Sequence, residues 1–180
     1  MIKDIQTISI KEFESPIGPM IAGATEQGIC LLEFTDRKIL EAELKALSKL
    51  LNAQVEDGDN KYFPILEKQL EEYYKGERKT FGIPLLIPGT DFQQSVWKEL
   101  LNIPYGVTRS YKQQSMALKK PEAIRAVAHA NGMNRIAIII PCHRVIGNNG
   151  SLTGYGGGLW RKKWLLDLEA KAMGQMQLAV

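Results

Sequence analysis

The chain has few cysteines and histidines and no long apolar run. Among its 180 residues are two of each, and neither Cys30 nor Cys142 belongs to a CxxC pair. This scarcity argues against a disulfide framework and against a zinc site. The apolar run at 136–140 is far shorter than the about 20 residues that cross a bilayer, and the N-terminus lacks the apolar core of a secretory signal. We therefore expect a soluble, cytoplasmic protein with free thiols, no metal and no other cofactor.

The charge is distributed unevenly along the chain. The whole sequence carries 23 basic and 20 acidic residues. Residues 109–163 hold ten of the basic residues and one acidic residue, a net charge of +9, and the remainder has a net charge of −6. A basic run is usually a solvated face, but this imbalance favours a polyanionic partner. It points to the C-terminal half as a nucleic-acid surface.

The first half combines strands with helices. Cys30 lies in the apolar run ICLLEF and is expected to be a small core residue. The residues Glu26-Gln27-Gly28 are typical of a hairpin turn. Leucines recur at three- and four-residue steps in the first predicted helix, and Gly76 ends the second. The predicted elements are two or three short strands within 8–15 and 19–35, a helix at 38–51, a loop around Gly58, a helix at 64–75 and an extended connector at 81–90.

The second half predicts three short helices joined by tight turns. Thr90 or Asp91 can cap a helix that carries Phe92, Val96 and the leucines at 100 and 101 on its apolar face. The following helices are expected at about 112–118 and from Pro121 to about 132. This is the outline of a helix-turn-helix domain, with the third helix in the recognition position.

A reactive thiol is expected at Cys142. The segment IAIII predicts a strand that leads directly into Pro141-Cys142-His143-Arg144. A nearby imidazole or cation raises the thiolate fraction of a cysteine. An inert core cysteine is the competing interpretation, but the adjacent His143 and Arg144 would be costly to bury without partners.

The context of this thiol resembles a known family. The motif PCHRVIG is preceded by GTDFQQSVW and IPYGVTRSY and followed by GYGGG and WLLDLE. In this order and spacing the motifs resemble the O6-alkylguanine-DNA alkyltransferases, with the match to their catalytic domain running from about residue 89 to 169. The segments LEKQLEEYYKGE and FGIPLL also resemble the end of the family's preceding domain. The resemblance implies a two-domain α+β fold. It consists of a small N-terminal α/β ribonuclease-H-like domain at 1–87, connector included, and a mostly helical, winged helix-turn-helix, DNA-binding and catalytic domain at 88–180.

The resemblance also implies roles for individual residues. Cys142 would be the nucleophile, His143 its base through a bound water, and Glu169 the carboxylate that orients the imidazole. Asn134 matches the family's hinge, which ties together the turns around the recognition helix and the active site. The residues expected to contact DNA or the extruded base are Arg125, which enters the base stack; Tyr111, which stacks on the nucleotide and donates to it; Val145, through its carbonyl; Tyr155, which packs on the base; and Gly156, through its amide.

The implied activity is DNA repair by direct reversal. The alkyl group of O6-alkylguanine, and of O4-alkylthymine, would move irreversibly to Cys142, so that each molecule acts once. The expected partner is double-stranded DNA that contains O6-alkylguanine, bound through the minor groove by a monomer. Three alternatives are a lesion-binding relative without a nucleophile, a helix-turn-helix regulator and a cysteine hydrolase. Cys142 argues against a lesion-binding relative without a nucleophile. The PCHR and glycine-loop motifs argue against a helix-turn-helix regulator, and a cysteine hydrolase would not need a DNA-binding surface.

Overall fold

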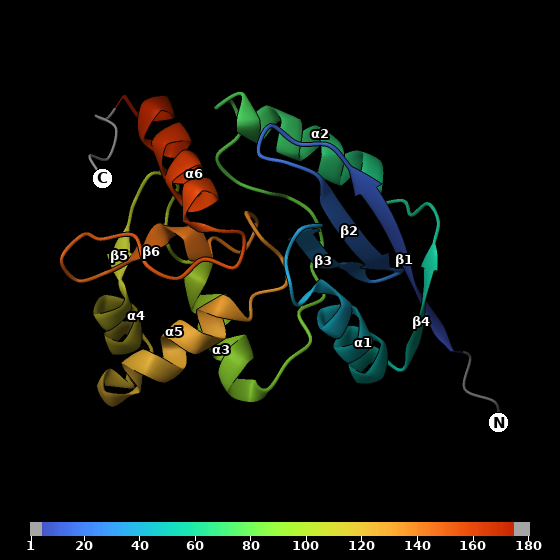
Figure 1. The fold of residues 1–180 in the computed structure, drawn as a ribbon, viewed down its shortest axis with the longest axis horizontal. Helices are drawn as coiled ribbons and strands as arrows, with labels where there is room; N and C mark the ends of the chain where they lie inside the picture. Colours follow the sequence, from blue (N-terminus) through green and yellow to red (C-terminus); the bar gives the residue numbers. More distant parts are fainter. Residues whose placement is uncertain (1–4, 175–180) are drawn as a thin grey trace.

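A four-stranded sheet and two helices form the N-terminal half of the fold (Figure 1). The computed structural model describes residues 5–174. The strand order is β3-β2-β1-β4, with β1 antiparallel to β2 and parallel to β4. The elements of this half are β1 (Gln6–Phe13), β2 (Met20–Thr25), β3 (Gly28–Phe34), α1 (Leu40–Leu51), β4 (Ala53–Asp57) and α2 (Phe63–Tyr74).

Both faces of this sheet are covered, which explains the continuous apolar runs of its central strands. One face contributes Met20, Leu32 and Phe34 to a core shared with α2. The other face contributes Ile21 and Leu31 to a second core, against which α1 packs. Cys30, predicted as a small core residue, is fully buried in this second core.

The predicted hairpin and helices are confirmed, but one strand was missed. Glu26 and Gln27 connect β2 to β3, and the helices begin and end within two residues of their expected bounds. The prediction of a plain loop around Gly58 did not include β4, which pairs with β1. Its alternation of Ala53 and Val55 with polar residues is brief, and its pairing partner lies far away in the sequence.

The C-terminal half contains the three expected helices. They are α3 (Asp91–Leu100), α4 (Tyr111–Ala117) and α5 (Ile124–Gly132), with a 3-10 turn η1 (Pro121–Ala123) before α5. Capping boxes begin α3 at Thr90 and α4 at Ser110. The Trp97 indole donates to the Ala130 carbonyl at 2.8 Å, so the first helix is fastened to the third.

The expected strand at 136–140 does not form. Ile136 makes a single bridge to Leu32, and the next residues turn. Ile138 has a φ of 71°, a left-handed conformation that is costly for a β-branched residue. Cys142 therefore begins a 3-10 turn, η2 (Cys142–Arg144), which leads into β6 (Val145–Ile146), the partner of β5 (Arg109–Ser110). The apolar residues here fill the core rather than extend a sheet.

The two halves are joined through backbone and core. The Leu32 amide donates to the Arg135 carbonyl and the Ala137 amide to the Leu32 carbonyl, both at 2.8 Å. The last helix, α6 (Leu159–Ala172), lies beside α2 (Figure 1), and the Trp164 ring contacts that of Tyr74 with centroids 6.0 Å apart. The loop before Cys142 is thus supported by the N-terminal sheet. No helix within residues 5–174 is long and apolar enough to cross a membrane.

Candidate active site

Cys142 lies half-buried beside the side chain of Asn134. The Asn134 amide nitrogen donates to the Ile140 carbonyl at 2.8 Å and to Sγ of Cys142 at 3.3 Å. Its Oδ1 accepts from the Ile136 amide at 3.0 Å. One buried side chain therefore fixes both ends of the turn that precedes the thiol. This geometry agrees with the hinge role predicted for Asn134.

The thiol is protonated in the resting protein. Burial raises the pKa of Cys142 above its ordinary value, while the Asn134 amide and the cations Lys162 and Arg37 act to lower it. From the sequence we expected a nearby imidazole or cation to raise the thiolate fraction, but the effect of burial on the pKa is larger because the sulfur packs against the core. A base is therefore needed to remove the thiol proton at neutral pH.

Glu169 is the centre of a buried hydrogen-bond network. Its side chain is 1% exposed. Oε1 lies 2.7 Å from His143 Nε2 and accepts from the Tyr73 hydroxyl at 2.8 Å, and Oε2 accepts from Arg144 Nε at 3.0 Å and from the Gly106 amide at 3.0 Å. Burial acts to raise the pKa of Glu169, but His143 and Arg144 outweigh it and hold the pKa well below its usual range. Glu169 is ionised.

The His143 imidazole is neutral, and its free nitrogen can accept a proton. Burial lowers the pKa of His143, and Glu169 only partly offsets that effect. The ionised carboxylate can only accept, so Nε2 carries the hydrogen. Nδ1 has no hydrogen-bond partner among the described residues. The ring therefore meets the requirements of the base predicted for it.

The transfer rate should respond to the protonation of His143. Because the pKa of His143 lies below its ordinary value of about 6.5, we expect the single-turnover rate to stay level through that pH. Below the pKa of His143 it should fall by about tenfold per pH unit, as the base becomes protonated. Rates of alkyl transfer measured across pH provide the check. A midpoint at or above 6.5 would contradict the assignment, and His129→Gln should leave the midpoint where it is.

Tyr111 and the glycine loop face one another near the thiol. The Tyr111 hydroxyl donates to the Thr153 carbonyl at 2.7 Å. The Lys162 ammonium donates to the same carbonyl at 2.8 Å and lies 3.4 Å from the Tyr111 hydroxyl. Burial lowers the pKa of Lys162 to about 8. This cation holds the loop against Tyr111.

The remaining predicted residues lie around this centre. Arg125 is exposed on α5, and Val145 is fully buried in β6. Tyr155 is half-buried, and its enclosed hydroxyl has no hydrogen-bond partner within residues 5–174. Gly156 is exposed in the loop before α6. The structure thus brings Cys142, His143, Glu169 and Asn134 together, with the predicted base-contacting residues in the surrounding loops and on α5.

Comparisons with known proteins decide the family. Residues 10–87 match the family described as "6-O-methylguanine DNA methyltransferase, ribonuclease-like domain", and residues 91–171 match its DNA binding domain. The chain is 46% identical to a methylated-DNA--protein-cysteine methyltransferase of Methanosarcina barkeri, with 87% of this chain and 93% of the relative covered. The chain belongs to the 6-O-methylguanine DNA methyltransferase family. The resemblance inferred from the sequence is confirmed.

Solved structures agree with this assignment. The Mycobacterium tuberculosis OGT in complex with DNA superposes with a TM-score of 0.78 at 41% identity, over 91% of this chain and 94% of that one. The O6-methylguanine-DNA methyltransferase of Pyrococcus kodakaraensis gives a TM-score of 0.60 at 26% identity, over 90% and 98%. The two-domain α+β organisation of this methyltransferase family member is therefore confirmed.

The basic segment is less exposed than its sequence suggested. Four of its ten cations are buried, and each of them has internal acceptors: Arg135, Arg144, Arg161 and Lys162. Arg109 is half-buried and pairs with Glu99 at 2.7 Å. The exposed cations lie on α4, α5 and the turn between them: Lys112, Lys119, Lys120 and Arg125. The exposed positive charge of this segment is therefore concentrated on α4, α5 and the turn between them.

Several functional contacts escaped the sequence analysis. Tyr73 and Arg144 bind Glu169, and nothing in the local sequence of either residue indicates that partner. Lys162 was counted with the DNA surface, although it stands seven residues before Glu169 and shares a helix face with Leu165 and Leu166. That periodicity is a signal of burial that could have been used.

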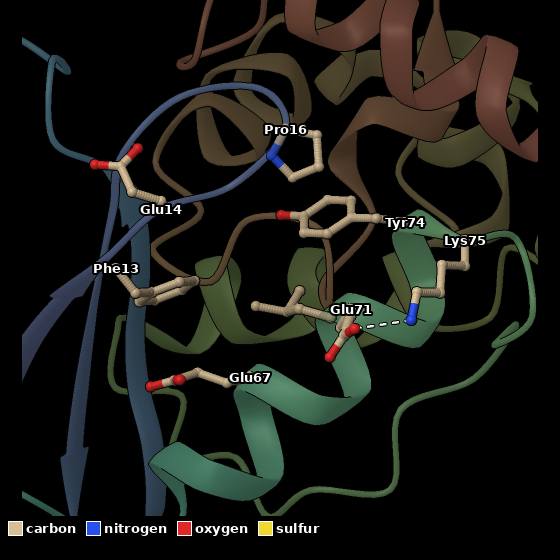
Figure 2. Close-up of a pocket in the computed structure, with 8 residues that line it drawn as sticks. Phe13, Glu14, Pro16, Glu67, Glu71, Tyr74 and Lys75 are labelled. Carbon is tan, nitrogen blue, oxygen red and sulfur yellow. Dashed lines mark hydrogen bonds and ion pairs between the residues drawn. The ribbon is translucent and has the colours of Figure 1, made fainter.

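A separate hollow lies in the N-terminal half, between α2 and the end of β1 with the residues that follow it. It has a volume of about 510 Å³, and Figure 2 shows Phe13, Tyr74 and three glutamates around it, with Lys75 paired to Glu71. No thiol or imidazole lines it. Within residues 5–174, no cluster of three or more His, Cys, Asp or Glu side chains is arranged to hold a metal ion.

Proposed function

We propose that this chain repairs DNA directly, by moving the alkyl group from O6 of a damaged guanine to Sγ of Cys142. The half-buried thiol beside a neutral His143, itself held by the ionised Glu169, is the observation that carries the proposal. O4-alkylthymine is a second substrate. The thioether product is stable, so each molecule acts once.

The reaction divides among the residues of the site. The Cys142 thiol gives its proton to Nδ1 of His143 through one intervening water. A bond forms between Sγ and the alkyl carbon while the bond from that carbon to O6 breaks. The electron pair stays with guanine, which takes up one proton while the Tyr111 hydroxyl supports it. His143 gives up the proton that it received, so the net change moves the thiol proton to guanine. Normal guanine and S-alkylcysteine are the products.

The damaged base must leave the duplex to reach the thiol. Extrusion costs a few kcal/mol and less for a poorly paired base, which favours lesions. Arg125 fills the vacated stack from α5, which binds the minor groove. Tyr155 packs on the extruded base, while the Gly156 amide and the Val145 carbonyl bind its edge. Exposed cations on α4 and α5 hold the phosphates without reading sequence.

Mass spectrometry tests this function. The protein is incubated with duplex DNA that carries O6-methylguanine, and intact and peptide masses are recorded. We expect one methyl group per protein, on the peptide that contains Cys142, with guanine restored and no turnover beyond one equivalent. An unmodified protein that still binds the lesion would instead indicate a binding module, and repeated turnover would indicate a hydrolase.

Arg125→Ala should slow repair of duplex DNA by about 10- to 100-fold, because the everted state loses the side chain that fills the stack. Its reaction with free O6-methylguanine base should be unchanged, since no extrusion is required. Rates with the two substrates provide the comparison. Lys68→Ala, an exposed cation on α2, is the matched control and should affect neither rate. Equal slowing on both substrates would argue against the stacking role.

The double variant Lys119→Gln/Lys120→Gln should weaken binding to undamaged duplex at low salt. Each lost phosphate contact lowers the slope of log affinity against log salt by about 1, so the slope should fall by about 2. Affinity measured over a range of salt concentrations tests this. Lys49→Gln/Lys68→Gln removes two exposed cations from the other half and should preserve the slope. An unchanged slope in the first variant would remove this turn from the interface.

Three further assignments complete the proposal. The protein acts as a monomer in the cytoplasm. Its domains divide between residues 87 and 88, within the connector whose Leu86 amide donates to the Ile29 carbonyl at 2.8 Å. Needing neither metal nor other cofactor, the reaction relies on side chains of this chain alone.

A further inference from the structure

An arginine of the N-terminal domain reaches the catalytic domain beside the thiol. Arg37 lies between β3 and α1, and its side chain is 7% exposed. It pairs with Glu33, which is 1% exposed, and lies 3.4 Å from Glu43, which is 3% exposed. We call these three residues the Glu33–Arg37–Glu43 cluster. Two buried carboxylates thus fix the position of one guanidinium.

The same guanidinium also binds the catalytic domain. Its Nη2 donates to the Gly132 carbonyl, and its Nη1, which also pairs with Glu33, donates to the Asn134 carbonyl at 3.2 Å. Gly132 ends α5, where unpaired carbonyls concentrate the negative end of the helix dipole, so a cation is favourable there. Asn134 is the residue whose side chain donates to Sγ of Cys142. Arg37 therefore connects the end of the recognition helix to the hinge of the active site.

The same guanidinium lies against the glycine loop. A Cβ added at Gly156 would stand 2.6 Å from Cζ of Arg37. Arg37 and Gly156 also line one open hollow of about 470 Å³. The N-terminal domain thus occupies the space that a side chain at position 156 would need.

We propose that Arg37 is a positioning residue for alkyl transfer, through which the N-terminal domain holds the Asn134 hinge, the end of α5 and the Gly156 loop in one arrangement. The proposal rests on Cys142 being the alkyl acceptor. It gives the N-terminal domain a role in the reaction that its sequence does not indicate.

The electrostatics are consistent with this role. Burial raises the pKa of Glu33 and takes that of Glu43 to about 7, and the Arg37 charge acts against both shifts. The same charge acts to lower the pKa of Cys142. Removing the guanidinium would therefore affect two buried carboxylates and the nucleophile together.

The decisive variant is Arg37→Lys, because it keeps the charge between the two glutamates while Arg37→Leu could unfold the domain. A lysine cannot bind both carbonyls in the fixed geometry of a guanidinium. We expect the single-turnover rate at saturating O6-methylguanine duplex to fall by about 10- to 100-fold, the scale of a small misplacement of reacting groups. The Kd for undamaged duplex and the thermal midpoint should stay close to those of the unmodified protein.

A neighbouring residue supplies the matched control. Asp36 pairs with Arg161 across the same domain boundary at 2.8 Å but does not contact the hinge. Asp36→Asn should leave the single-turnover rate unchanged. A rate for Arg37→Lys equal to that of the unmodified protein, or a Kd that weakens in the same proportion as the rate, would overturn the proposal.

A double-variant cycle with Gly156→Ala supplies a second test. In the unmodified background the new methyl group meets the Arg37 guanidinium and should slow transfer. In the Arg37→Lys background the guanidinium is absent, so Gly156→Ala should lower the transfer rate by a smaller factor. If the double variant instead lowers the rate by the product of the two single factors, the proposal is overturned. Failure of the unmodified protein to methylate Cys142 would instead refute the proposed function, so the two failures are distinguishable.

Discussion

Serine in place of Cys142 is expected to stop alkyl transfer. The hydroxyl is close in size to the thiol and can still accept the hydrogen bond from Asn134, which reaches Sγ at 3.3 Å. Its oxygen ionises far less readily than sulfur, and a neutral imidazole cannot compensate. Loss of a nucleophile from a coupled catalytic set costs on the order of 10⁶-fold in rate. Transfer of a labelled methyl group from duplex DNA should therefore fall below detection.

Binding and fold should survive this change. The substitution leaves the exposed cations of α4 and α5 unchanged. The Kd for duplex DNA should therefore match that of the unmodified protein. Cys30→Ala is the matched control: Cys30 is fully buried, and burial raises the pKa of its thiol to about 12. That variant should still take up one methyl group. Methyl transfer that persists in Cys142→Ser, or that is lost in Cys30→Ala, would contradict the assignment of the acceptor.

Local patterns predicted the helices well because their signals are contained in a few neighbouring residues. Thr90 with Gln93, and Ser110 with Gln113, form capping boxes whose partners are three residues apart. The hairpin turn at Glu26 and Gln27 is equally local. Such elements can be inferred without knowledge of the tertiary structure.

Features that depend on distant partners could not be inferred in this way. The apolar run at 136–140 has the composition of a strand, but Ile138 adopts a φ of 71° and is buried in the core. Arg161 appeared to be a surface cation, yet it is buried where it donates to the Ile17 carbonyl and to Asp36. The family resemblance supplied the proposed catalytic residues, whereas the contacts of Tyr73 and Arg37 with the site are seen only in the folded structure.

Glu169→Gln is expected to damage both stability and activity. The carboxylate is 1% exposed and accepts from Arg144 and Tyr73 while it orients His143. Glutamine leaves the Arg144 charge buried without its partner, so the free energy of unfolding should fall by about 3–5 kcal/mol. The misoriented imidazole should lower the transfer rate on the order of 10²- to 10⁴-fold. Chemical denaturation and single-turnover kinetics measure the two effects.

The pH dependence of this loss identifies its cause. The pKa of Glu169 in the folded protein lies below its ordinary value of about 4.3. The ionised carboxylate therefore contributes fully to the free energy of unfolding above a pH of about 4.3, and this contribution is lost as the pH falls through the pKa of the folded protein. The stability difference between the two proteins should therefore shrink on acidification, since protonated glutamate resembles glutamine. Asp167→Asn, which removes only the partly exposed pair with Lys163, should change stability by about 0.5 kcal/mol or less. A difference that grows as the pH falls would exclude the buried carboxylate as its source.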